Sequence, residues 1–249
     1  MTQSVSDLEL WARTHRFFRA LAIIALMLAL LRIAQAGGPK YVAGASYFNQ
    51  GTIGAPLTWS GGVISYYTDQ GDLSSSFPGP TADALVADAF GQWSSISTAA
   101  VAAIRRGQLA EDVSGANVYG NPDGTITMPS DILPSATGTP VGIVYDEDGS
   151  VTDAFLGQGA GSASECFDNA VFGWIDNFGT DTHFAHALVV INGNCAQSSS
   201  ESTDVEYRLV RVLGRILGLD WSQVNDNVVT HNPRPTSDDY AGFSRDARF

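Results

Sequence analysis

The sequence predicts an α+β domain, and three observations support this prediction. Residues 63–68 are rich in β-branched and aromatic side chains, which is typical of a strand, and the turn-forming Asp-Gln-Gly follows them. Apolar side chains then recur at helical spacing from residue 82 to residue 93. Further strand-like segments precede a second amphipathic helix, predicted over residues 203–217. One domain that combines strands and helices fits this order.

The N-terminus has the features of an export signal. Three arginines precede an apolar run over residues 20–31, and Ala34-Gln35-Ala36 has the form of a signal-peptidase site. Residues 1–36 are therefore predicted to be a signal peptide, with an uncleaved anchor as the alternative. The protein is expected to be secreted or held in the cell envelope, with no membrane contact beyond this segment, because no second apolar run of spanning length follows.

The chain is strongly acidic. Its 249 residues include 13 basic and 26 acidic side chains, a formal net charge of −13. Four arginines and two acidic residues belong to the signal segment, so the mature chain has 9 basic and 24 acidic residues and a net charge of −15. Such a surface disfavours nucleic acid and anionic membranes as partners, and suits a soluble protein or one that meets cations.

Between the two long helices the sequence indicates short elements. Residues 37–60 are expected to form an extended lead-in, and Thr81 is the expected N-cap of a first helix that ends near Ser95. A second helical piece is predicted over residues 98–108, and the sequence Asn-Pro-Asp-Gly at 121–124 predicts a turn. Strands are predicted over the following segments: 125–128, 141–145 and 185–192. A long loop is expected between the last two.

The last helix has recognisable ends. Thr203 and Glu206 have the spacing of a capping box, which predicts the helix start at Thr203. Leu209, Leu213 and other apolar residues at helical spacing form its predicted buried face. Gly218 is the expected stop.

Cys166 and Cys195 are the two cysteines of the chain. In an exported protein they predict one disulfide, with two free buried thiols as the alternative. Neither cysteine lies in a motif that indicates a nucleophile.

Three segments resemble the metzincin superfamily of zinc metallopeptidases, in particular its matrixin-like branch. They are VISYYTDQGDL with ADALVADAFGQWSSIST, then HFAHALVVING, and finally EYRLVRVLGRILGLDWSQVN. The last segment aligns with the family's active-site helix, H-E-x-x-H-x-x-G-x-x-H. The resemblance implies a metzincin-like fold, a twisted mixed five-stranded sheet with two principal helices, over residues 37–232. Residues 233–249 would then be a polar C-terminal tail.

The chemistry of that motif is missing from this chain. The three zinc-ligand positions hold Arg211, Arg215 and Trp221, and Val212 takes the place of the general base. A guanidinium stays protonated and has no lone pair for a metal, so no zinc and no catalytic residue are expected at these positions. The methionine turn of the family is missing as well, because no methionine follows the helix.

The same helix carries a candidate binding face. Arg208, Arg211 and Arg215 follow one another at spacings of three and four, which places them on one side of the helix, with Trp221 beyond it. Arginine forks fit the carboxylates of a peptide or another anionic partner. The alternative is internal: the arginines pair with carboxylates of this acidic chain and, with Trp221, fill the former metal cavity.

Two further groups of side chains are candidate metal ligands. Asp146, Asp148 and Asp153 alternate around a glycine, as in loops that bind calcium, and the alternative is an acidic turn after a strand. His183, His186 and His231 do not complete a set of four zinc ligands, and are expected to be surface or hydrogen-bonding histidines.

The sequence therefore predicts an exported, metallopeptidase-like domain without catalytic activity, a pseudo-protease that binds a peptide, a partner or a surface component through the former active-site cleft. Two alternatives remain open at this stage. One is an active metallopeptidase or other hydrolase with non-standard ligands. The other is a structural protein of an envelope or matrix. No cofactor is expected, and calcium is a better candidate than zinc.

Overall fold

The computed structural model describes residues 39–44, 50–52, 54–97, 99–179 and 181–219. The predicted signal peptide (1–36), Trp221, His231 and the predicted tail (233–249) lie outside the described residues. Among the helices that are described, none is long and apolar enough to cross a membrane.

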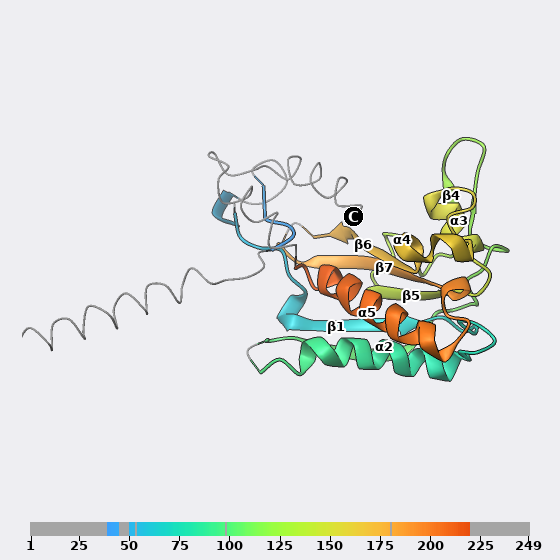
Figure 1. Cartoon of the computed structure of the whole chain (residues 1–249). Helices are drawn as coiled ribbons and strands as arrows, with labels where there is room; N and C mark the ends of the chain where they lie inside the picture. Colours follow the sequence, from blue (N-terminus) through green and yellow to red (C-terminus); the bar gives the residue numbers. More distant parts are fainter. Residues whose placement is uncertain (1–38, 45–49, 53, 98, 180, 220–249) are drawn as a thin grey trace, which may run out of the picture. The chain divides into compact units, whose positions relative to one another are not determined.

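A five-stranded mixed sheet forms the centre of the described chain, with the strand order β2-β1-β5-β7-β6 (Figure 1). The strands are β1 (Val63–Thr68), β2 (Ala102–Gln108), β5 (Val141–Asp146), β6 (Val171–Phe178) and β7 (Phe184–Asn192). β2, β1, β5 and β7 are parallel, and β6 is antiparallel to β7. The predicted mixed sheet of an α+β fold is thus confirmed.

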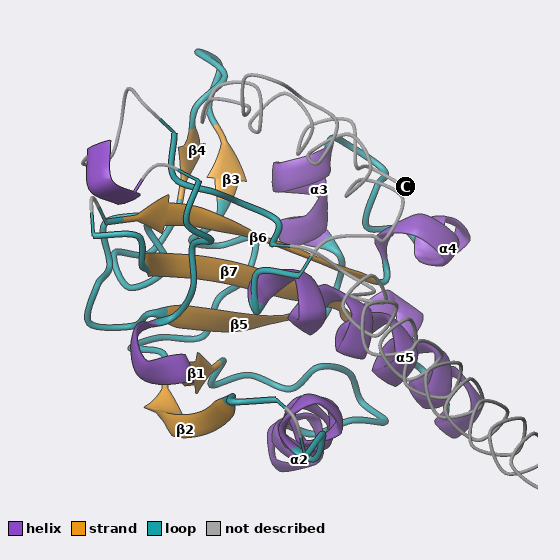
Figure 2. Cartoon of the chain, turned by 90° about the vertical axis from the view of Figure 1, so that its left-hand side faces the viewer, coloured by secondary structure: helices purple, strands orange, loops and turns teal. Residues whose placement is uncertain are grey.

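Two long helices pack against one face of this sheet. They are α2 (Gly79–Ser94) and α5 (Ser199–Ile216), which contact each other and lie close together in both views (Figures 1 and 2). Their apolar stripes meet the inward side chains of β1, β5 and β7, which creates the larger of two cores. These are the two principal helices that the sequence predicts.

A smaller core lies on the other face of the sheet. It contains Leu188 and Val190 of β7, Val144 of β5, and Val151 of the short helix α3 (Ser150–Leu156). The segment between β2 and β5 contributes further apolar residues and includes a small hairpin, β3 (Tyr119–Gly120) with β4 (Ile126–Thr127). This hairpin surrounds the turn that Asn-Pro-Asp-Gly predicts.

Both long helices begin before the predicted residues. The N-cap of α2 is Pro78 rather than Thr81, and the Asp72 carboxylate accepts a 2.7 Å hydrogen bond from the N–H of Gly79. α5 begins at Ser199, so the predicted capping box at residues 203–206 is wrong and lies inside the helix. Ser198 is the N-cap in an extended conformation, and the Glu201 carboxylate accepts a 2.8 Å hydrogen bond from the N–H of Gln197, so the helix starts a turn earlier than Thr203.

The predicted helix over residues 98–108 is also wrong. This segment contains β2, which pairs in parallel with β1 at the edge of the sheet. Its alanines favour a helix locally, but Arg105 reaches across to Thr68 of β1 and Asp83 of α2. Strand pairing and these contacts override the local preference.

Three elements lie in segments for which the sequence predicts loops, namely α3, β6 and the one-turn helix α4 (Cys166–Asn169). β6 is the strand at the free edge beside β7, and α3 follows the acidic turn after β5. β6 was missed because apolar residues lie on both of its faces, so it has no simple alternation of polar and apolar residues.

The predicted disulfide is present. Cys166 and Cys195 are joined with a Cα–Cα distance of 5.4 Å. Cys166 begins the short helix α4 (Cys166–Asn169) ahead of β6, and Cys195 follows β7. The bond therefore ties together the two ends of the β6–β7 hairpin that lie nearest the start of α5.

Candidate functional site

The C-terminal end of α5 closes with a glycine turn. Gly218 follows the helix with a φ of 91°, a conformation that favours glycine. The N–H of Leu219 donates to the carbonyl of Gly214 and the N–H of Gly218 to the carbonyl of Arg215, each over 3.0 Å. This pair of bonds is a Schellman motif, and it confirms Gly218 as the stop of the helix.

Gly214 is the point where α5 and α2 cross. A Cβ at this position would lie 2.5 Å from the ring of Trp93, so only glycine lets the indole lie on the helix backbone. The same indole donates a 2.8 Å hydrogen bond to the carbonyl of Val210. The glycine is therefore explained by packing between the two helices.

Val212, which aligns with the family's general base, makes an apolar contact with β6. A Cβ at Gly173 of β6 would lie 3.0 Å from Cγ1 of Val212, so the valine packs closely on the backbone of that strand. A valine has no group that can accept a proton, and this side chain belongs to the packing of α5 on β6.

The arginines of α5 have different surroundings. Arg211 is exposed, and its guanidinium lies 5.7 Å from the centre of the Tyr207 ring. Arg215 is half-buried one turn further along. Arg208 pairs with Asp204 at 2.6 Å, donates to the carbonyl of Phe167 and lies over the ring of that phenylalanine. Arg208 is thus held against α4, whereas Arg211 and Arg215 occupy the two aligned histidine positions.

An open strand edge lies beside this helix. β6 pairs with β7 on one side, and the described residues provide no strand on its other side. The N–H of Asn192 donates to the carbonyl of Ala170, and backbone groups alternate in direction along an antiparallel strand. The N–H and C=O groups of Val171, Gly173 and Ile175 therefore face away from β7.

The two edges of the sheet differ in character. From Val171 to Ile175 the β6 edge has no charged side chain, and Phe172 and Trp174 stack with their ring centres 5.9 Å apart. β2, at the opposite edge, carries Arg105 and Arg106 in succession and has an irregular register with β1, whereas the register of β6 with β7 is regular from Val171 to Ile175 and shifts only after it. Charges and irregularities protect edge strands from pairing with other chains, so β6 is the less protected edge.

The histidines that the structure describes do not form a metal site. His186 is completely buried on β7, and its Nδ1 lies 2.6 Å from the carboxylate of Asp176. His183 is near the surface, with Nδ1 3.3 Å from the carbonyl of Thr58. In the described ranges no group of three or more histidine, cysteine, aspartate or glutamate side chains could hold a metal ion.

The calcium candidates are bound to nearby backbone groups. The buried carboxylate of Asp146 accepts hydrogen bonds from the N–H groups of Val151 and Thr152 and from the Thr152 hydroxyl. Asp148 accepts from the N–H of Ser150, and Asp153 from the N–H of Gly161. These bonds arrange the start of α3 and the loop after it, so the acidic turn is the role that the geometry supports.

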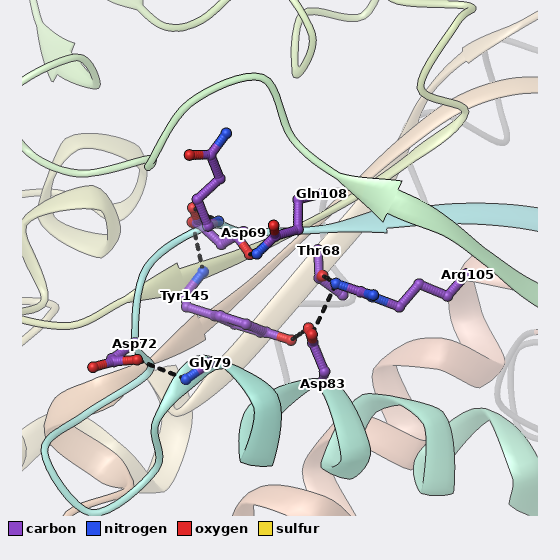
Figure 3. A network of polar contacts seen from close by, with 9 residues as sticks. Thr68, Asp69, Asp72, Gly79, Asp83, Arg105, Gln108 and Tyr145 are labelled. Atoms are coloured by element: carbon purple, nitrogen blue, oxygen red, sulfur yellow. Dashed lines mark hydrogen bonds and ion pairs between the residues drawn. The ribbon is translucent and has the colours of Figure 1, made fainter.

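A polar network that the sequence did not reveal lies at the carboxyl ends of the parallel strands (Figure 3). The Tyr145 hydroxyl donates to Asp83 over 2.9 Å, and Asp83 also forms a 2.8 Å ion pair with Arg105. Arg105 in turn donates to the hydroxyl of Thr68. The network links α2 with β1, β2 and β5, and burial raises the pKa of the Tyr145 hydroxyl above its usual value.

Asp69, immediately after β1, is the most perturbed carboxyl in this region. It is 1% exposed and accepts hydrogen bonds from three backbone N–H groups, those of Gln70, Val113 and Tyr145. Burial raises the pKa of this carboxyl to about 7, the three hydrogen bonds act against that rise, and the charge of Asp112 adds to it. All three donors are backbone groups, and Asp69 thus fastens three segments together.

Comparisons with models of protein families, with curated proteins and with solved structures found no match for this chain. Its function is therefore inferred from its own residues.

Proposed function

We propose that this chain is an exported, metzincin-like domain without peptidase activity, which binds an extended peptide segment along the free edge of β6 beside α5. The observation that carries the proposal is that α5 packs next to β6, the strand at the open edge of the sheet. The positions of α5 that align with the family's zinc ligands and general base hold arginine, valine and arginine, and the open edge of β6 lies next to this helix.

The loss of hydrolysis follows from the side chains at those positions. Arg211 and Arg215 repel a dication and have no lone pair to offer a metal. Val212 has no proton-accepting group and is packed on Gly173. Zinc-assisted attack by water needs both the ligands and the base, so neither part of that chemistry is available at these residues.

The edge of β6 supports binding of an extended chain. Outward N–H and C=O groups at Val171, Gly173 and Ile175 can form main-chain hydrogen bonds with an added strand. Close packing of Val212 on the inner face of Gly173 and the disulfide next to the strand hold this edge in place. A fixed edge loses little conformational entropy on binding.

The proposal is tested with a displayed library of random twelve-residue peptides, using the full chain as bait. Binders enriched on the wild-type protein are then measured against Val171→Pro, which removes one outward N–H at the first residue of β6. Because Ala170 is in the αR conformation, which a following proline disfavours, the folding of this variant is checked first by urea unfolding. Val171→Ala is the matched control because it also shortens the side chain but keeps the N–H.

We expect at least about a tenfold loss of affinity in the proline variant and less than about a threefold loss in the alanine variant, since one main-chain hydrogen bond is lost only in the former. Equal binding to both variants would mean that the peptide does not bind along the edge of β6. Stoichiometric zinc in the purified protein, or chelator-sensitive cleavage of a peptide library, would instead contradict the proposed loss of peptidase chemistry.

A further inference from the structure

A pocket of about 360 Å³ lies between the C-terminal ends of α2 and α5. Trp59 and Trp93 form two of its walls, residues 99–101 form a third, and Leu217 and Leu219 close it from the end of α5. A cavity of this size falls within the range of small-molecule sites in proteins.

The two indoles are fixed in place. Trp59 donates from Nε1 to the carbonyl of Ile216 over 2.7 Å, and its ring meets that of Phe184 in an edge-on arrangement with centres 5.7 Å apart. Trp93 donates to Val210 and lies on Gly214. Because both N–H groups are already bonded to α5, the rings offer the pocket carbon surface and π-electrons rather than hydrogen-bond donors.

The lining carries no charge. Its side chains are apolar except for the hydroxyl of Thr58, although the chain as a whole has a formal charge of −13. A charged ligand would lose its hydration here without gaining a partner of opposite charge. A neutral, flat and apolar group satisfies the walls best, since aromatic rings pack favourably against fixed indoles.

We infer that this pocket binds a neutral aromatic ring. The ring belongs either to a small aromatic molecule or to an aromatic side chain of a peptide, and the chemistry that recognises it is the same. The site goes beyond the proposed function, because it lies by α2 and the start of β2, whereas β6 is at the opposite edge of the sheet.

The test is a titration of the full chain, labelled with ¹⁵N, followed through the side-chain N–H signals of its tryptophans. One arm uses indole, and the other uses the neutral peptide Gly-Gly-Trp-Gly-Gly with blocked ends. We expect the Trp59 and Trp93 signals to shift saturably with a Kd below about 1 mM, while the Trp174 signal stays unchanged. Tighter binding of indole indicates a small molecule, and tighter binding of the peptide indicates a side chain.

A pair of phenylalanine variants tests whether the NMR shifts come from binding in this pocket. Val101 lines it, whereas Val63 is 39% exposed at the start of β1 and does not line it. We expect Val101→Phe to weaken binding at least about tenfold and Val63→Phe to leave it within about twofold. Should Val101→Phe fail to fold, Leu219→Ala, at an exposed lining residue, is expected to weaken binding about threefold.

Three results would overturn the inference. The first is no saturable shift in either arm, and the second is equal binding to the two phenylalanine variants. The third is binding that occurs only after Trp221→Ala, because the chain's own tryptophan would then be the occupant of the pocket.

Discussion

Replacing Asp69 by asparagine is expected to change how the stability of the protein depends on pH. The pKa of this carboxyl rises from 3.8 to about 7 on folding, mainly through burial. The folded state therefore holds the proton more tightly than the unfolded state. The stability that this group contributes is fully present below about pH 4 and is lost as the pH rises through 7.

The magnitude follows from the pKa values. Each unit by which the pKa of a group differs between the folded and unfolded states corresponds to about 1.4 kcal/mol. The rise in the pKa of Asp69 therefore accounts for about 4 kcal/mol of stability that is lost between pH 4 and pH 8. The carboxyl is 1% exposed, and solvent screening reduces this figure little. Burial also raises the pKa of Asp146, which therefore changes the pH dependence of stability in the same direction, in the wild-type protein and in Asp69→Asn alike.

The assay is urea unfolding of wild-type protein and Asp69→Asn at pH 4, 5, 6, 7 and 8. Because an amide supplies one oxygen acceptor to three N–H donors, the variant is expected to be less stable at pH 4. The gap should narrow or reverse as the pH rises. Asp112→Asn, which removes a neighbouring negative charge, should reduce the pH dependence only in part. A gap that stays constant over this range would refute the reasoning.

Three further predictions concern stability, and the first has a control variant. Gly214→Ala is expected to destabilise the fold by about 1–3 kcal/mol in urea unfolding, because its Cβ would meet the Trp93 ring. Gly91→Ala, with open space at the same kind of helical position, should instead stabilise by about 0.5–1 kcal/mol, and equal effects would contradict the helix crossing. Tyr145→Phe should cost about 1 kcal/mol in the same assay, and no loss would mean that its hydroxyl bond adds nothing. Replacing both cysteines by serine should cost about 3–4 kcal/mol by the chain-entropy model for a 29-residue separation, and a loss under about 1 kcal/mol would contradict it.

Elements with a single buried face could be predicted from the sequence. α2 and β1 have clear periodicity because one side of each meets the core, and Gly218 is an unambiguous stop for α5. β6 lacks that signal because Val171 and Ile175 face α5 while Phe172 and Trp174 pack toward α3. A strand that is apolar on both faces resembles any other apolar stretch, and its place at the sheet edge depends on pairing that is distant in sequence.

Only the part of the candidate site that lies on a single helix could be predicted from the sequence. Arg211, Val212 and Arg215 belong to a local motif, so their positions on α5 follow from helical geometry alone. The network of Asp83, Arg105 and Tyr145 joins residues from three elements, and no spacing in the sequence relates them. Arg105 lies in the segment that the sequence predicts as a helix, and its contacts with Thr68 and Asp83 follow from the pairing of β2 with β1.

Packing explains some of the residues of α5 but not its arginines. Gly214 beneath Trp93, Gly218 at the stop and Val212 on Gly173 each have a structural reason that holds whether or not a metal is bound. Arg211 is exposed and Arg215 is half-buried, and the apolar packing of α5 does not explain why arginine is at either position. Two roles are considered for them: pairing with the chain's own carboxylates, or recognition of a partner. Alanine at both positions discriminates between these two: internal pairing predicts a loss of stability with unchanged peptide affinity, and recognition predicts the reverse.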